Sequence, residues 1–271
     1  MAFAASALLQ FSGNLTNFGA VSNLNAFQGW NLGGYGLEGP LATGLNELVG
    51  LVNLTLSQNR FTGTLPVEWA WTPRFSLLKH LNLDGNPTLS ATLPPAWGGN
   101  GAFSSLQVLN ISGSNITGEL PLSWGYSGSL SALIELDLSH NSITGVLPSS
   151  WSVSNSLPQL RSLILTDNLL GGALPSSWGS QSQAFPSLEM VDVASNSLTG
   201  TLPAAWCGEG FPSLQGLSLH GNEISGPLPD SWGTTNCFAS LSIMALHNNR
   251  LTGSVPFTWG SSTSFASLAN L

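Results

Sequence analysis

The chain has 271 residues, of which 13 are Asp or Glu and only 5 are Lys or Arg, so its formal net charge is −8. Five dispersed cations cannot form a basic stripe that neutralises phosphates, which excludes a nucleic-acid binder and argues against docking on anionic membranes. No run of about 18 apolar residues is present, so no segment of this sequence is predicted to span a bilayer. The hydrophobic content of 42 % is enough for a large core and argues against disorder.

From residue 34 onward the sequence repeats with a period of 26–28 residues. Eight complete units carry the pattern L-x-x-L-x-L-x-x-N-x-L-[TS]-G-x-L-P-x-x-W, and a degenerate unit around Leu37 and Leu41 precedes them. We expect residues 34–267 to form a repeat array and residues 268–271 to begin a further unit. Such a period is typical of a solenoid, in which each unit packs against its neighbours. The repeat prolines are Pro66, Pro94, Pro121, Pro148, Pro175, Pro203, Pro229 and Pro256.

Each position of the unit has a predicted physical role. The alternation in L-x-L predicts a short strand with two inward side chains. The Asn that follows would end the strand inside the coil, where its amide must be satisfied by backbone groups of its own and the next coil. Ser114 takes this place in the third unit. The Gly four residues after the Asn, as in Gly145, fits a turn with positive φ. The second unit has an extra residue near Pro87 and Ala91 in place of the Gly, which predicts a local bulge.

One tryptophan stands three residues after every repeat proline. These side chains could form a surface that stacks on carbohydrate or lipid, but one aromatic in the same register of every unit favours a buried column that fills the solenoid. We therefore expect them to be core residues. They are Trp69, Trp97, Trp124, Trp151, Trp178, Trp206, Trp232 and Trp259.

The unit resembles the plant-specific class of leucine-rich repeat. The resemblance implies a repeat solenoid of α/β type: a right-handed superhelix with a concave parallel β-sheet and a convex side of irregular, 3₁₀ and short helical segments. Residues 1–33, with Ala7-Leu8-Leu9-Gln10-Phe11 and Trp30-Asn31, look like the N-terminal cap of the family, although no Cys precedes Cys207. The longer, Trp-bearing repeats are more similar to surface proteins of green algae or protists. No C-terminal cap follows the unit that begins at 268–271, so we expect further repeats or self-association there.

Two features favour a secreted or cell-surface location. The sequence has four N-glycosylation candidates, at Asn14, Asn53, Asn110 and Asn115. Cys207 and Cys237 lie in adjacent units, in the convex segment after the Trp, where stacked coils could bring them within disulfide distance. Two free buried thiols are the alternative.

Ligands of leucine-rich repeat proteins usually meet the outward strand residues, so we read the candidate partner-binding residues from that register. All four histidines fall on this face. His220 and His247 share a column, and His140 neighbours Asp167; a metal or pH-sensitive site is one interpretation and solvated surface residues are the other. No third ligand is evident, so we expect no metal. The acidic members either dock a cationic partner or keep the face soluble. The candidates are His80, Asn82, Asp84, Glu135, Asp137, His140, Asp167, Asp192, His220 and His247.

The sequence predicts a binding protein and not an enzyme. No nucleophile, base and orienting group come together by register, the repeat glycines are turn residues, and we expect no cofactor. The favoured hypothesis is an extracellular module that recognises a protein, peptide or glycan through its concave face. The alternative is a structural matrix or filament component assembled from such solenoids. Ice binding, which is known in this family, needs a flat repeated array and is disfavoured by the mixed concave columns.

Overall fold

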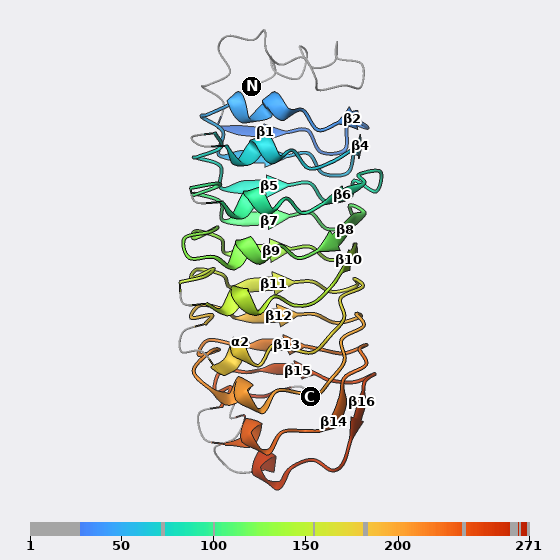
Figure 1. Cartoon of the computed structure of the whole chain (residues 1–271), viewed down its shortest axis with the longest axis vertical. Coiled ribbons are helices and arrows are strands. Elements are labelled where there is room, and N and C mark those ends of the chain that lie inside the picture. The colour runs from blue at the N-terminus through green and yellow to red at the C-terminus, as the bar shows by residue number, and fades with distance from the viewer. Residues whose placement is uncertain are drawn as a thin grey trace.

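The computed structural model describes residues 28–271 except 72–73, 100, 154, 181–183, 235–236, 261–264, 266 and 270–271. Within these residues the chain winds into a single stack of coils, one coil per sequence repeat (Figure 1). Most of the segment expected to form a cap, including the candidate Asn14, and the last two residues of the predicted further unit lie outside the described residues.

Nine short parallel strands form one continuous sheet, with one strand from each coil. Equivalent repeat positions face each other across it: Asn53 pairs with His80, and Glu135 pairs with Ser162. The register predicted from the L-x-L alternation is therefore confirmed. The first strand lies within the 1–33 segment. The strands are β1 (Gly29–Asn31), β3 (Asn53–Thr55), β5 (His80–Asn82), β7 (Val108–Asn110), β9 (Glu135–Asp137), β11 (Ser162–Ile164), β12 (Met190–Asp192), β13 (Gly216–Ser218) and β15 (Ile243–Ala245).

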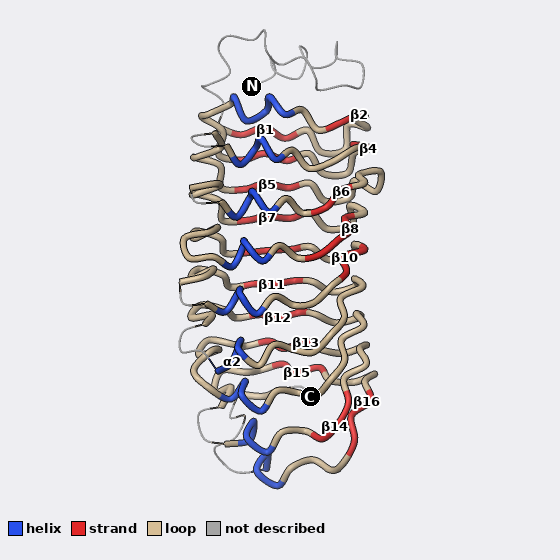
Figure 2. Tube along the Cα trace, in the orientation of Figure 1, coloured by secondary structure: helices blue, strands red, loops and turns tan. Residues whose placement is uncertain are grey.

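Shorter strands and helical turns complete each coil, and Figure 2 shows them as two further columns beside the sheet. The shorter strands pair in parallel in groups of two or three and are β2 (Glu38–Pro40), β4 (Arg60–Thr62), β6 (Ala91–Thr92), β8 (Ile116–Glu119), β10 (Ser142–Thr144), β14 (Ser225–Pro227) and β16 (Arg250–Thr252). The convex side carries the 3₁₀ helices η3 (Thr43–Glu47), η4 (Val67–Ala70), η5 (Pro95–Gly98), η6 (Leu122–Gly125), η7 (Ser149–Ser152), η8 (Ala204–Cys207), η9 (Asp230–Gly233) and η10 (Phe257–Gly260), together with the short helix α2 (Ser177–Ser180).

The repeat asparagines form a buried ladder along the stack. The Nδ2 of Asn168 donates to the Leu165 carbonyl of its own coil at 3.1 Å and to the Leu138 carbonyl at 3.0 Å, and its Oδ1 accepts the Ile143 N–H at 3.0 Å. Leu138 and Ile143 belong to the preceding coil. The expected role of the Asn is confirmed, but the expected partner, the next coil, is wrong. Ser114 likewise bridges to the coil that precedes its own, because its hydroxyl donates to the Leu83 carbonyl at 2.8 Å.

The repeat tryptophans are confirmed as core residues, since each side chain is at most 9 % exposed. They also carry a ladder of hydrogen bonds that the sequence did not predict. The indole Nε1 of Trp97 donates to the Pro66 carbonyl at 3.0 Å, and that of Trp151 donates to the Pro121 carbonyl at 3.0 Å. From Trp97 onward, every indole thus binds the repeat proline of the preceding coil. This bond satisfies a buried N–H that would otherwise be costly and sets the spacing of the coils.

The turn positions follow the sequence prediction. The repeat Gly has positive φ, for example 80° at Gly145, where a side chain would be strained. In the second unit the extra residue is absorbed by a turn at Pro87–Thr88, closed by the Leu89 N–H donating to the Asn86 carbonyl at 3.0 Å. Leu89 then enters the core, so the predicted bulge is confirmed.

Candidate functional site on the concave face

The outward residues of the nine-stranded sheet form four columns, which together we call the concave face. The first column runs from Asn53 and His80 to Glu135 and Ile243, and the second contains Asn82, Asn110, Asp137 and Asp192. The third and fourth columns follow the strand ends. The third contains Asp84, His220 and His247, and the fourth contains His140 and Asp167. All ten predicted site residues therefore lie on this one face.

The acidic candidates of the middle coils do not form one compact cluster. Glu135 and Asp137 lie on β9, whereas Asp192 lies two strands away on β12, with Ile164 of β11 between the two aspartates in the second column. Asp167 follows β11 in the fourth column. The structure therefore spreads four carboxylates over three adjacent strands, which suits an extended partner better than a single bound ion.

The second column has a structural role that sequence reasoning missed. The Oδ1 of Asp137 accepts the Ser139 N–H at 3.0 Å, and that of Asp192 accepts the Ala194 N–H at 3.0 Å. Asn82 and Asn110 make the same bond two residues ahead. These are Asx turns, which end each strand locally. One oxygen of each aspartate is therefore engaged with the backbone, and an Asn or Asp as the last residue of a strand could have indicated it.

Residues of the fourth column adopt the left-handed backbone conformation, with positive φ, where the chain turns after each strand. The column includes Gly85 with φ 65°, His140 with φ 54° and Asp167 with φ 57°. His and Asp tolerate this conformation better than most residues, which explains why polar side chains gather here. The turn brings His140 Nδ1 to 2.7 Å from the Asp167 Oδ2, and both side chains are nearly two-thirds exposed. The predicted His140–Asp167 neighbourhood is thus present as a direct contact.

Carboxylates without an Arg partner are unevenly distributed on the molecule, and every charged residue lies in the described part of the chain. Each of the four arginines is paired with a Glu of an adjacent coil, as Arg161 is with Glu189 at 2.9 Å; the other pairs are Arg60–Glu38, Arg74–Glu47 and Arg250–Glu223. Nine carboxylates then have no Arg partner. Five of them lie on the concave face: Asp84, Glu135, Asp137, Asp167 and Asp192. The remaining four, Glu68, Glu119, Glu209 and Asp230, are distributed over the rest of the surface.

The other histidines are also engaged. The rings of His220 and His247 stack with centroids 4.5 Å apart and planes 14° apart, and the Ser218 hydroxyl lies 2.9 Å from the His220 Nδ1. His80 Nδ1 contacts the Oδ1 of Asn53 in the preceding coil. Among the described residues no group of three or more His, Cys, Asp or Glu side chains could hold a metal ion.

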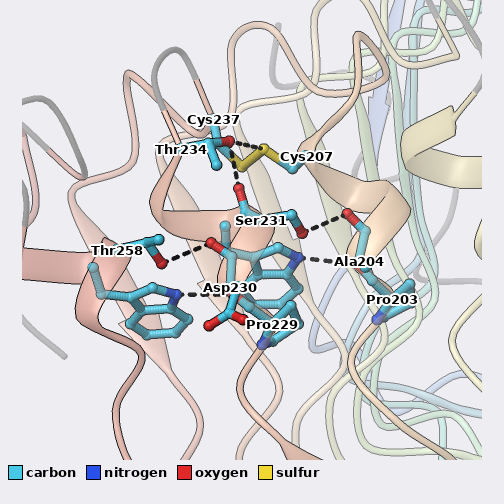
Figure 3. Close-up of a disulfide and its surroundings, with 11 residues drawn as sticks. Pro203, Ala204, Cys207, Pro229, Asp230, Ser231, Thr234, Cys237 and Thr258 are labelled. Atoms are coloured by element: carbon cyan, nitrogen blue, oxygen red, sulfur yellow. Dashed lines mark hydrogen bonds between the residues drawn. A yellow bond between two sulfur atoms is a disulfide. The ribbon is translucent and has the colours of Figure 1, made fainter.

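The two cysteines lie on the convex side, away from the concave face. Cys207 and Cys237 form a disulfide that joins adjacent coils, with Cα atoms 4.9 Å apart (Figure 3). The Thr234 hydroxyl lies 3.3 Å from the Cys207 Sγ. Two hydrogen bonds join the same two coils nearby: the Trp232 indole donates to the Pro203 carbonyl, and the Ser231 hydroxyl donates to the Ala204 carbonyl (Figure 3).

The candidate glycosylation sites differ in their position. Asn115 is exposed beside the strand β8, where a glycan would not cover the sheet. Asn53 and Asn110 belong to the concave face, and Asn110 Oδ1 also accepts the Ser112 N–H at 2.9 Å. A glycan on either of these two residues would cover part of the candidate binding surface.

Comparisons with known proteins agree with this architecture. The family described as Leucine rich repeat matches residues 104–170, and a second family of the same description matches residues 213–235. No curated protein matches the sequence. Among solved structures, PEPR1–AtPEP1 shares 30 % identity with a TM-score of 0.72 over 87 % of this chain and 30 % of that chain.

Two further structures illustrate the range of similar proteins. The Arabidopsis receptor kinase HAESA, in complex with the peptide hormone IDA and the co-receptor SERK1, shares 31 % identity over 89 % of this chain and 37 % of that chain, with a TM-score of 0.67. A plant ice-binding protein shares 25 % identity over 90 % of this chain and 72 % of that chain, with a TM-score of 0.62. The chain spans only about a third of the length of the two receptor chains. The matched repeats support a leucine-rich repeat protein, and the fold is that of the leucine-rich repeat solenoids in these structures.

Proposed function

We propose that this chain is a ligand-binding module, not an enzyme, and that its concave face docks a protein or peptide partner. The inward positions repeat from coil to coil, whereas the concave positions vary along the stack, as in Asn53, His80, Val108 and Glu135 of the first column. A rigid scaffold with a varied polar face is suited to recognition. The solved structures that it resembles include the receptor kinase HAESA in complex with the peptide hormone IDA, which supports the same use here.

The observation that carries the proposal is the concentration of carboxylates without an Arg partner on the concave face. Inter-coil pairing with Glu occupies all four arginines, and five of the nine carboxylates without an Arg partner face outward from one sheet. Complementary charge speeds the encounter of two partners and sets their register. We therefore propose a cationic partner, rich in Lys or Arg, that lies along β9, β11 and β12. A neutral glycan could form no ion pair with these carboxylates and would gain only hydrogen bonds from its hydroxyls.

We also propose that the module acts outside the cell or on its surface. A disulfide between two coils persists in oxidising compartments and is rare in the cytosol of mesophiles. Cys207 and Cys237 form such a bond, and Asn115 offers an exposed glycosylation candidate. No helix among the described residues is both long and apolar enough to cross a membrane.

The test is a selection from a random peptide display library, followed by affinity measurements on two charge-matched variants. The concave variant E135Q/D137N/D167N/D192N removes four carboxylates from the proposed site. Asn keeps the Asx bond at positions 137 and 192, as Asn82 and Asn110 do naturally. The control variant E68Q/E119Q/E209Q/D230N removes four carboxylates elsewhere and has the same net charge.

We expect the selected peptides to be enriched in Lys and Arg. They should bind the concave variant at least about tenfold more weakly than the wild type, because several close charge pairs are lost, and should bind the control variant as well as the wild type. Equal losses in both variants would mean that only net charge matters and would contradict the proposed site. Filaments of the purified chain in place of peptide binding would favour the structural alternative.

A further inference from the structure

All four histidines of the chain lie on the concave face, one in each of four different coils. We propose that they form a pH-sensitive release device: the cationic partner binds at neutral pH and leaves at mildly acidic pH. The inference rests on the proposed function, since it concerns the regulation of the same face. Histidine is the side chain that in general changes charge between pH 5 and 8. Protonation of these four residues therefore changes the charge of the surface that holds the partner.

His140 acts directly on a carboxylate of the site. Its Nδ1 lies 2.7 Å from the Asp167 Oδ2, in the adjacent coil of the fourth column. The column neighbour on its other side is the uncharged Gly113, and its own strand contributes Asp137, which bonds to the Ser139 N–H and hydroxyl. When His140 is protonated, it forms an ion pair with Asp167 and competes with a Lys or Arg of the partner for that carboxylate.

His220 and His247 add charge near the C-terminal end of the face. Their rings stack at 4.5 Å, an arrangement that is favourable for neutral rings and repulsive when both carry a proton. The His220 Nδ1 also contacts the Ser218 hydroxyl, and the preceding residue of the third column is the uncharged Ala194. The carboxylate closest to His220 by register is Asp192 on β12, the strand that pairs with β13. Protonation of both stacked rings would place two positive charges near Asp192, at the C-terminal end of the row of carboxylates on β9, β11 and β12.

His80 extends the effect to the N-terminal end of the face. It contacts Asn53, follows Lys79 directly in the sequence, and shares its coil with Asp84. Its column neighbour on the other side is the uncharged Val108. A proton on His80 adds to the charge of Lys79 and lowers the attraction of Asp84 for a cation.

The sum of these effects is large. Five carboxylates face outward, and one proton on each of the four histidines would bring the net charge of the concave face from −5 to −1. For a partner with several positive charges at distances near 10 Å, screened at physiological salt, this change weakens binding by roughly tenfold or more.

The experiment measures binding of fluorescein-labelled hexalysine, whose side chains in general stay charged from pH 5 to 8. Fluorescence anisotropy gives the affinity at pH 7.5 and pH 5.5 at the same ionic strength. The proteins are the wild type, the variant H80Q/H140Q/H220Q/H247Q, which is uncharged at these positions throughout, and the control variant E68Q/E119Q/E209Q/D230N. Hexaglutamate serves as the probe of opposite charge.

We expect a roughly tenfold weaker affinity at pH 5.5 for the wild type and for the control variant, and a nearly constant affinity for the histidine variant. Wild-type binding that is equal at both pH values would overturn the release device and leave the proposed function intact. A loss at pH 5.5 that persists in the histidine variant would also overturn it, because other groups would then be responsible. No binding at pH 7.5 would overturn the proposed cationic partner as well.

Discussion

Substitution of Trp151 by Phe isolates one step of the indole ladder. Trp151 is fully buried, and its Nε1 donates to the Pro121 carbonyl of the preceding coil at 3.0 Å. Phe keeps an aromatic ring in the same register but has no N–H, so the Pro121 carbonyl loses this donor. The variant therefore tests whether the bond between coils, and not only the buried area, stabilises the solenoid.

The expected loss has two parts. The Pro121 carbonyl still accepts the Trp124 N–H at 3.2 Å, so the lost indole bond costs the net value of one hydrogen bond, about 0.5–1.5 kcal/mol. The smaller ring leaves a cavity that costs about 1 kcal/mol more. The free energy of unfolding should therefore fall by about 1.5–2.5 kcal/mol, a substantial share of the roughly 5–15 kcal/mol that stabilises a typical domain.

Urea unfolding followed by far-UV circular dichroism measures this loss. The matched control is W71F, because Trp71 is 57 % exposed and lies outside the ladder; it should change stability by less than about 0.5 kcal/mol. A W151F loss of that same small size would refute the claim that the indole bonds hold adjacent coils together.

Two other stability predictions concern the remaining links between coils. N168A should destabilise the chain by about 2–4 kcal/mol, because it removes the amide bonds to the Leu138 and Leu165 carbonyls and leaves the buried Ile143 N–H without its acceptor. N168S should cost less, because Ser114 fills this position naturally; urea titration of the two variants compares them. Reduction of the Cys207–Cys237 disulfide should lower the free energy of unfolding by about 2–4 kcal/mol, which is measured as a lower melting temperature in the presence of reductant. The control is the variant C207S/C237S, whose melting temperature should not change when the same reductant is added.

The repeat period determined much of the fold in advance. The spacing of leucines predicted the register of the sheet, and the regular placement of Trp97 or Trp151 predicted burial, because a solenoid forces equivalent residues into equivalent environments. The period does not say which neighbouring coil a side chain reaches. That depends on the pitch of the coil in three dimensions. The sequence therefore predicts the bonding partner of the Asn168 amide in the next coil, whereas the amide bonds to the preceding one.

The candidate face could be listed from the sequence, but its internal bonds could not. The register placed Asp137 and His140 on the correct face, whereas the engagement of one Asp137 oxygen by the backbone depends on the turn that follows the strand. The arginine pairs did leave a signal in the sequence, because Arg161 and Glu189 are one repeat apart. Together these pairs leave nine carboxylates without an Arg partner, five of which lie on the concave face.

Hydrogen–deuterium exchange with the tightest display-selected peptide tests the central claim most directly. The account predicts slower exchange in the segments that contain β9, β11 and β12, because a partner on the concave face shields the ends of these strands, and unchanged exchange in η7 to η9 on the convex side. Protection confined to the convex helices, with none in these three strands, would contradict it.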